Sequence, residues 1–340
     1  MKVAIYNPYL DTLGGGERYT MAFAKVVTDA GYKVDVQWKS STIRKKLEKR
    51  FGFNLNKINI VRNIERGDGY DICFWLSDGS IPQLKARKNF LHFQFPFSGV
   101  NGKSLLNRMK LYRINEVICN SHFTKRFIDN EYGVNSRVIY PPIDVSNIKP
   151  RKKENVILSV GRFSQLTQAK RQDVLISSFE RLYVRGGKKW RLILAGGIEV
   201  GADKYLKKLK NMIIDYPIEI IESPDYKKLL SLYGKAKIFW SASGYGIDEE
   251  KEPLKVEHFG IAVVEAMAAG SVPVVFDAGG HKEVIRDDKN GYLWKKGQLA
   301  KLTEVLIRNK EKLRLLADRA HEDSKKYSYE QFKKSVEDIL

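Results

Sequence analysis

Short runs of strand-forming residues alternate with longer segments of helical periodicity along the first half of this chain. Helices are predicted over residues 17–30 and 42–50. Several of the strands are apolar throughout, which is typical of a parallel sheet covered by helices on both faces. The predicted strands are "KVAIYNP", "KVDVQW", "YDICFWLS", "NFLHFQFP" and "EVICNS".

The alternation pauses at "VSNIKPRKKEN", a polar and basic segment, and then starts again. Further strands are predicted at "NVILSVGRF", "WRLILAGG", "IEIIES", "KIFWSAS" and "VPVVFDAGG", with helices between them. Two such series in tandem predict an α/β protein made of two facing, doubly wound, Rossmann-like domains with a ligand cleft between them. We expect the domains to span residues 1–149 and 150–327, with a last helix over 328–340 joining the first domain.

The composition indicates a globular protein that prefers anionic partners. The 340 residues carry a net charge of +20, and the excess is spread over both halves. Two cysteines, in apolar strand-like runs, predict buried thiols and no disulfide framework. The first residues contain no basic leader with an apolar core, and no apolar run approaches the length of a membrane span, so we expect a cytoplasmic protein and keep peripheral attachment at the inner membrane face as an option.

Two basic runs, "STIRKKLEKRFGF" and "LLNRMKLYR", have the pattern of amphipathic helices. Such helices suit an anionic membrane surface, and a plain solvated helix face explains them equally well. A nucleic-acid-binding protein would also account for the charge, but it should concentrate its cations beside stacking aromatic residues. We therefore expect no nucleic-acid partner and keep that class as an alternative.

The stretch "EHFGIAVVEAMAAG" contains two glutamates, Glu257 and Glu265, in an otherwise apolar segment. A helix is expected to begin near Phe259 or Gly260, which places Glu257 before the helix and Glu265 on it. The N–H groups of the first turn and the helix dipole would face any anion bound there. Two carboxylates beside a phosphate site would accept hydrogen bonds from sugar hydroxyls. The alternative is that both are ordinary helix residues.

Two cations flank the loop that follows the strand "NVILSVG". Arg162 comes directly after the strand, and Lys170 comes before the next helix together with Arg171. Cations in this arrangement suit a diphosphate leaving group, while a solvated loop is the plain alternative in so basic a chain. No D-x-D triplet and no His/Cys/Asp cluster has metal-ligand spacing, so we expect a reaction without a metal or other cofactor.

In the first half, three glycines separate the first strand from the first helix in "LGGGER". They do not spell G-x-G-x-x-G, and "KVDVQW" offers no acidic residue for a ribose, so a nicotinamide site is not favoured. His92 ends an apolar strand at the edge where ligands of such sheets bind, although a lone histidine is often structural. His122 precedes a helix and is expected to be structural.

These motifs together resemble the retaining glycosyltransferases of sequence family 4, which have the two-domain GT-B fold. The resemblance covers nearly the whole chain and is carried by "GGGER", "NSHFTK", "YPPID", "GRF" with "AKR", "EHFGIAVVEAMAAG", and "GGHKEVI" with "NGYL". "GGGER" with "EHFGIAVVE" is most similar to the branch that adds mannose to polyprenyl-linked oligosaccharides. A GT-B nucleotide-sugar epimerase shares the architecture and remains an alternative.

The resemblance implies a transferase that moves a hexose, of mannose or glucose type, from a GDP- or UDP-linked sugar to a glycan, glycolipid or polyprenyl-linked acceptor. It implies a catalytic set of His92, Arg162, Lys170 and Glu257. It implies that the donor is bound by Gly15, Gly16, Arg162, Lys170, Phe259, Gly260 and Glu265. The charged segment over residues 243–256 departs from the family pattern and would act as a lid or an acceptor contact.

Overall fold

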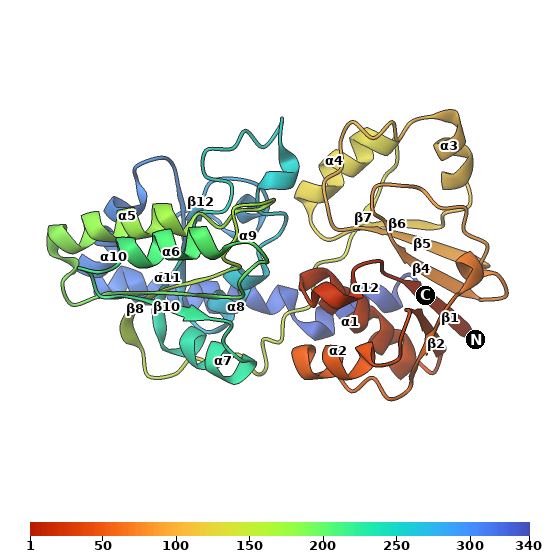
Figure 1. The fold of residues 1–340 in the computed structure, drawn as a ribbon, viewed down its shortest axis with the longest axis horizontal. Helices are drawn as coiled ribbons and strands as arrows, with labels where there is room; N and C mark the ends of the chain where they lie inside the picture. Colours follow the sequence, from red (N-terminus) through yellow and green to blue (C-terminus); the bar gives the residue numbers. More distant parts are fainter. The chain divides into compact units, whose positions relative to one another are not determined.

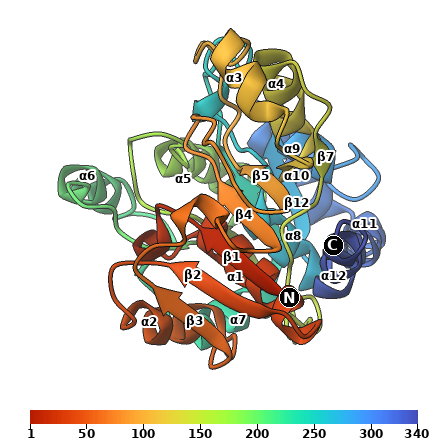
Figure 2. The ribbon, with the colours of Figure 1, turned by 90° about the vertical axis from the view of Figure 1, so that its right-hand side faces the viewer.

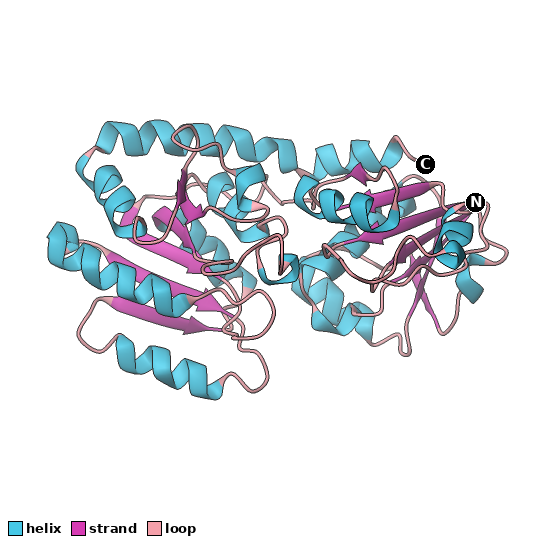
Figure 3. Cartoon of the chain, turned by 90° about the horizontal axis from the view of Figure 1, so that it is seen from above, coloured by secondary structure: helices cyan, strands magenta, loops and turns pink.

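The computed structural model describes all 340 residues, and they form two compact units. Unit 1 contains Met1–Pro142 and Tyr329–Leu340, and unit 2 contains Ile143–Ser328. In each unit a parallel β-sheet is flanked by helices (Figure 3). The prediction of two doubly wound α/β domains is therefore confirmed.

Unit 1 is built on a seven-stranded sheet with the order β3-β2-β1-β4-β5-β6-β7, part of which is seen in Figure 2. Its strands are β1 (Lys2–Tyr6), β2 (Lys33–Gln37), β3 (Ile58–Val61), β4 (Ile72–Leu76), β5 (Lys88–Phe93), β6 (Glu116–Cys119) and β7 (Arg137–Val138). Its helices are α1 (Gly15–Asp29), α2 (Ile43–Phe51), α3 (Leu105–Leu111), α4 (His122–Tyr132) and α12 (Tyr329–Glu337).

Hydrophobic cores lie on both faces of this sheet. The larger core joins α1, α2 and α12 to the strands, and Figure 1 shows α12, the end of the chain, beside α1. A smaller core packs Ile128 and Tyr132 of α4 against Leu91 and Phe93 of β5. Both cysteines are free and buried, as expected. The α4 helix begins at His122, and the Ser121 hydroxyl caps it by accepting the Thr124 N–H at 3.0 Å.

Unit 2 repeats the plan with a six-stranded sheet in the order β10-β9-β8-β11-β12-β13. Its strands are β8 (Glu154–Val160), β9 (Arg191–Gly196), β10 (Ile218–Glu222), β11 (Ala236–Ser241), β12 (Val272–Phe276) and β13 (Tyr292–Trp294). Its helices are α5 (Gln172–Leu182), α6 (Asp203–Met212), α7 (Tyr226–Lys235), α8 (Ile261–Ala268), α9 (His281–Val284), α10 (Leu299–Arg308) and α11 (Lys310–Ser324).

Alternating residues of the unit 2 strands face opposite sides of the sheet, which explains why the strands are apolar throughout. Ile238 and Trp240 of β11 belong to the core that also contains α5, α6 and α10. Phe239, between them, lies 6.3 Å from the Tyr233 ring of α7, measured between ring centroids. Helices therefore cover both faces.

The boundary between the units differs from the expected one at residue 149. It falls after Pro142, because the Ile143 N–H donates to the Tyr327 carbonyl at 2.8 Å and Ile143 forms a β-bridge with Ser328. These contacts tie the start of the expected linker to unit 2. At the second crossing the division before Tyr329 lies one residue from the expected start of the last helix.

In both sheets the order of the strands reverses beside the first strand, between β1 and β4 in unit 1 and between β8 and β11 in unit 2. Ligands of open parallel sheets bind at such points, outside the carboxyl ends of the strands. The loops that leave β8 and β11 in unit 2 are therefore the first place to look for a site.

Candidate functional site

Lys170 and Glu257 form an ion pair at the point where the strand order of unit 2 reverses. The Lys170 Nζ lies 2.8 Å from the Glu257 Oε2 and 3.5 Å from the Ser243 hydroxyl, which follows β11. Both charged side chains are mostly buried, with exposed fractions of 22% and 18%. The loop from β8 and the segment before α8 are thus joined by a partly buried cation and anion.

The Glu257 carboxylate stays ionised in this setting. Burial alone would raise its pKa, but Lys170, followed by His281, attracts the charged form more strongly and lowers the pKa to about 2. Gly161 permits the approach of the lysine, since a Cβ at this position would lie only 2.7 Å from the Lys170 Cγ.

Two glycines of the β12–α9 loop fix the backbone around Glu257. The Gly280 N–H donates to the Glu257 carbonyl at 2.7 Å. A Cβ on Gly280 would lie 2.5 Å from the His258 carbonyl oxygen, and a Cβ on Gly279 would lie 2.2 Å from the Glu257 carbonyl oxygen. A nonbonded Cβ does not approach an oxygen atom this closely. Only glycine at both positions therefore lets the two loops pack against each other.

The second glutamate, Glu265, lies on α8 and is held by a tyrosine from α7. The Tyr233 hydroxyl donates to the Glu265 Oε2 at 2.8 Å, and both residues are buried. The helix begins at Ile261, after Gly260 with a φ of 106°. This left-handed conformation favours glycine and lets the chain turn from Phe259 into the helix.

Arg162 is turned toward a different partner from Lys170. Its Nη1 lies 3.2 Å from the Glu199 Oε1, and 59% of the side chain is exposed. The structure therefore brings Lys170 and Glu257 together and engages Arg162 with the loop after β9. A role in holding a diphosphate requires the guanidinium to exchange Glu199 for phosphate, and this role stays a prediction.

The charged segment over residues 243–256 contacts the rest of unit 2 at two points. The Arg171 Nη1 donates to the Tyr245 carbonyl at 3.1 Å, while Asp173 holds the same guanidinium through two contacts of 3.1 and 3.2 Å. Glu249 accepts the Gly279 N–H at 2.6 Å and pairs with Lys282. The segment thus packs beside the glycines that fix Glu257.

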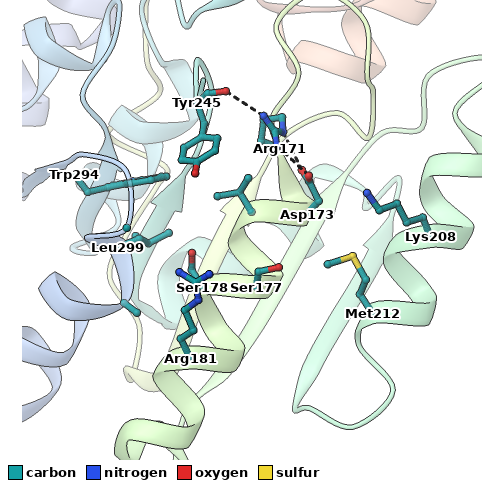
Figure 4. A pocket seen from close by; sticks show the side chains of 13 residues that line it. Arg171, Asp173, Ser177, Ser178, Arg181, Lys208, Met212, Tyr245, Trp294 and Leu299 are labelled. Carbon is teal, nitrogen blue, oxygen red and sulfur yellow. Dashed lines mark hydrogen bonds and ion pairs between the residues drawn. The ribbon is translucent and has the colours of Figure 1, made fainter. Parts of the chain in front are cut away.

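A cavity of about 310 Å³ lies next to this segment, between α5, α6 and the start of α10. Figure 4 shows Arg171, Asp173 and Tyr245 at one end of it and Arg181 at the other. None of the residues predicted to bind the donor lines this cavity. It is therefore distinct from the Lys170–Glu257 pair.

In unit 1, Gly15 and Gly16 are the first residues of α1, whereas the sequence placed them in the loop before a helix that starts at residue 17. Gly16 contacts Gln94, which follows β5: the Gln94 Nε2 donates to the Gly16 carbonyl at 3.2 Å, and a Cβ on Gly16 would lie 2.1 Å from the Gln94 Oε1. A side chain at residue 16 would therefore displace the end of the flexible Gln94 side chain. The predicted approach to a donor remains a separate prediction.

His92 is completely buried in unit 1. Its ring stacks on Tyr19 with 4.1 Å between centroids, its Nδ1 lies 3.2 Å from the Ile118 carbonyl, and its Nε2 has no hydrogen-bond partner. Burial lowers the pKa of His92 to about 3, so the ring is neutral. Contact between His92 and a sugar would require the surrounding side chains to move, and its catalytic role stays a prediction.

Sequence reasoning missed several residues beside the predicted site. His281 is buried, with its Nδ1 2.8 Å from the Phe276 carbonyl and its Nε2 without a hydrogen-bond partner. His258, inside the glutamate motif, lies against Gln168, whose Nε2 is 2.7 Å from the Nδ1 of the ring. The motif "GGH" directly after a strand was a usable signal for His281, whereas nothing in the sequence marks Tyr233 as the partner of Glu265.

The structure contains neither a metal-binding cluster nor a membrane-spanning helix. No group of three or more His, Cys, Asp or Glu side chains is arranged to hold a metal ion. No helix combines the length and the apolar character needed to cross a membrane.

The two units, each with a parallel sheet flanked by helices, define an α/β protein with two doubly wound domains. A family model described as "Glycosyl transferases group 1" matches residues 143–323, which is just over half of the chain. The chain belongs to this family.

Similar proteins agree with this assignment. A mannosyltransferase of Dictyostelium discoideum, "GDP-Man:Man(3)GlcNAc(2)-PP-Dol alpha-1,2-mannosyltransferase", is 28% identical over 54% of this chain, and the match spans only 37% of that relative. The Kluyveromyces lactis protein "Alpha-1,3/1,6-mannosyltransferase ALG2" is 27% identical over 84% of this chain and 71% of its own length. The resemblance to the branch that acts on polyprenyl-linked oligosaccharides is thereby supported.

A solved structure agrees at the level of the fold. Anabaena HepE, crystallised with UDP, superposes with a TM-score of 0.78 at 18% sequence identity and covers 99% of both chains. The GT-B architecture expected from the motifs is therefore confirmed.

Proposed function

We propose that this protein is a retaining hexosyltransferase acting in glycan biosynthesis at a cytoplasmic membrane face. It would move a mannose- or glucose-type sugar from a GDP- or UDP-linked donor to a hydroxyl of a glycan, glycolipid or polyprenyl-linked acceptor. The observation that carries this proposal is the Lys170–Glu257 pair at the switch point of unit 2, followed by α8 with its buried Glu265. Membership in the glycosyltransferase family favours transfer over epimerisation.

In the proposed reaction the bond between the anomeric carbon and the diphosphate breaks, and a bond from that carbon to the acceptor oxygen forms. The diphosphate leaves with the electron pair, and the acceptor hydroxyl gives its proton to a leaving phosphate oxygen on the same face. The Lys170 ammonium would stabilise the charge that develops on the diphosphate. Glu257 would orient Lys170 and accept hydrogen bonds from the sugar, while Glu265, positioned by Tyr233, would bind the ribose.

The proposed reaction needs no metal ion, because the chain supplies positive potential of its own. Lys170 is already fixed beside Glu257 at 2.8 Å, and the first turn of α8 directs its N–H groups out of the helix after the turn at Gly260. Arg162 would add a second cation once it leaves Glu199.

A thermal-shift screen against UDP, GDP, ADP and their sugar conjugates tests the donor class. We expect one nucleotide series to raise the unfolding midpoint, because a ligand that binds only the folded protein adds about 2.7 kcal/mol at a concentration 100 times its Kd. The matched control is Glu265→Gln, which should bind the same nucleotide more weakly. If no nucleotide raises the midpoint of the wild-type protein, the proposed function is wrong.

A further inference from the structure

Helix α3 exposes an unusual number of large apolar side chains. The exposed fractions are 75% for Leu105, 70% for Leu106, 64% for Met109 and 94% for Tyr112, which directly follows the helix. No residue of α3 is buried. An amphipathic helix of a folded domain normally turns its apolar side chains to the core, so a stripe left in water indicates an interaction surface.

The charged residues in the sequence around α3 all have the same sign. No acidic residue occurs between Asp78 and Glu116, while seven lysines and arginines do. Four of them, Lys103, Arg108, Lys110 and Arg113, lie on or beside the helix. Lys103 interacts with the Glu131 carboxylate, and the other three form no ion pair. At 100° per residue, Arg108 and Lys110 fall on the two sides of the apolar stripe. The surface is therefore an apolar strip bordered by unpaired cations.

The loop that leads into α3 is held firmly. The Glu131 carboxylate of α4 accepts the N–H groups of Gly99, Val100 and Gly102 at 2.8, 3.1 and 2.9 Å. Partial burial would raise the pKa of Glu131, but these backbone hydrogen bonds and Lys103 together lower it. The helix is thus presented on a fixed support.

We propose that α3, with Lys103, Tyr112 and Arg113, attaches this protein to an anionic lipid surface. Apolar side chains would enter the region between headgroups and acyl chains, the cations would contact anionic headgroups, and Tyr112 would lie at the interface. A protein partner is less suited to this surface, because a stable protein interface buries about 800 Å² on each side and one two-turn helix offers much less.

The structure shows that α3 differs from the other basic helix, α2, although the two have similar sequence patterns. In α2 the apolar residues Ile43 and Leu47 are buried, and the Arg44 guanidinium donates to the Ile58 carbonyl at 2.7 Å. Its exposed face therefore has charges but no apolar side chains to insert. Figures 1 and 2 show α2 and α3 at opposite ends of unit 1.

The attachment is independent of the proposed reaction. The Arg113 carbonyl, just after α3, accepts from the Asn89 side chain at the start of β5, so this end of the helix lies at the amino-terminal edge of the sheet, opposite the edge where parallel sheets bind ligands.

Vesicle flotation of the full chain tests the proposal. We expect flotation with vesicles that contain anionic lipid, little with purely zwitterionic vesicles, and weaker binding as salt rises. The triple variant Leu105→Ser, Leu106→Ser, Met109→Ser keeps every charge and should bind at least about tenfold more weakly, because three apolar side chains no longer leave water. The control Lys45→Ser, Lys46→Ser, Lys49→Ser on α2 removes three cations and should bind nearly as well as wild type.

Each other outcome decides against the proposal. It is wrong if the wild-type protein does not float at low salt, or if the α3 variant floats as the wild type does. It is also wrong if the only effect of the α3 substitutions is to convert a self-associated protein into a monomer. In that case α3 contacts a second copy of the chain instead of lipid. Sugar transfer to a water-soluble acceptor should be unchanged in the α3 variant. Flotation without any transfer would leave the attachment standing and reject the proposed function.

Discussion

Replacing Lys170 by alanine should lower kcat/KM for sugar transfer by about 100-fold. Removing one group that stabilises developing negative charge in a water-poor site typically costs a factor of 100 to 1,000 in rate. Lys170 is the cation already fixed at the switch point, 2.8 Å from Glu257. Steady-state kinetics with the donor identified by the thermal-shift screen measure the effect.

Two control variants separate the chemistry from general loss of charge or stability. Lys207→Ala removes an exposed lysine of α6 and should leave kcat/KM unchanged. Arg162→Ala should cost about tenfold, less than Lys170→Ala, because its guanidinium must first leave Glu199. The unfolding midpoint is measured for each variant. For Lys170→Ala it shows how far a Glu257 carboxylate without its ion-pair partner destabilises the fold. If both Lys170→Ala and Arg162→Ala keep the wild-type kcat/KM, these two cations do not stabilise the departing diphosphate.

Gly280→Ala should also lower turnover by about 100-fold, although residue 280 carries no reactive group. The added methyl would lie 2.5 Å from the His258 carbonyl oxygen and from the Phe259 Cα, both of which are backbone atoms. The segment that carries Glu257 must then move, and a shift of about 1 Å at a reacting centre costs on the order of 100-fold in rate. Overpacking should also lower the free energy of unfolding by about 1–3 kcal/mol.

The matched steric control is Gly197→Ala after β9. A Cβ at this position would meet no atom within 4 Å, so the unfolding midpoint should stay at the wild-type value. Rates of Gly280→Ala are compared with those of the wild-type protein after both are shown to be folded. If Gly280→Ala turns over at the wild-type rate, the exact position of the Glu257 backbone does not matter for the reaction.

The fold could be predicted from the sequence because short apolar runs, bounded by turn residues, alternate with longer segments of helical periodicity. Runs such as "RLILAGG" and "KIFWSAS" correspond to β9 and β11 and lie beside the central β8 of unit 2. The short strand β13 and the four-residue helix α9 were not predicted, since elements of this length carry too few positions to show a period. The first domain boundary was missed because it depends on the long-range bridge between Ile143 and Ser328.

The site could be predicted only as a set of residues near one edge of a sheet. The sequence placed Lys170 and Glu257 in two separate loops, and only the family resemblance assigned both to one site; the structure adds that they form an ion pair. The partner of Arg162 and the burial of His92 depend on side-chain packing across strands, for which the sequence has no local signal. The difference between the two basic helices likewise emerges only from which apolar residues the sheet buries.

The central claim is that the chain itself stabilises the departing diphosphate while the sugar keeps its anomeric configuration. The most direct measurement incubates protein, donor and acceptor with excess EDTA and determines the anomeric configuration of the product by the proton coupling in NMR spectra. We predict full activity in EDTA and an α-linked product from an α-linked nucleotide sugar, because Lys170 and the start of α8 take the place of a metal ion. Loss of activity that magnesium restores, or a product of inverted configuration, would contradict the account.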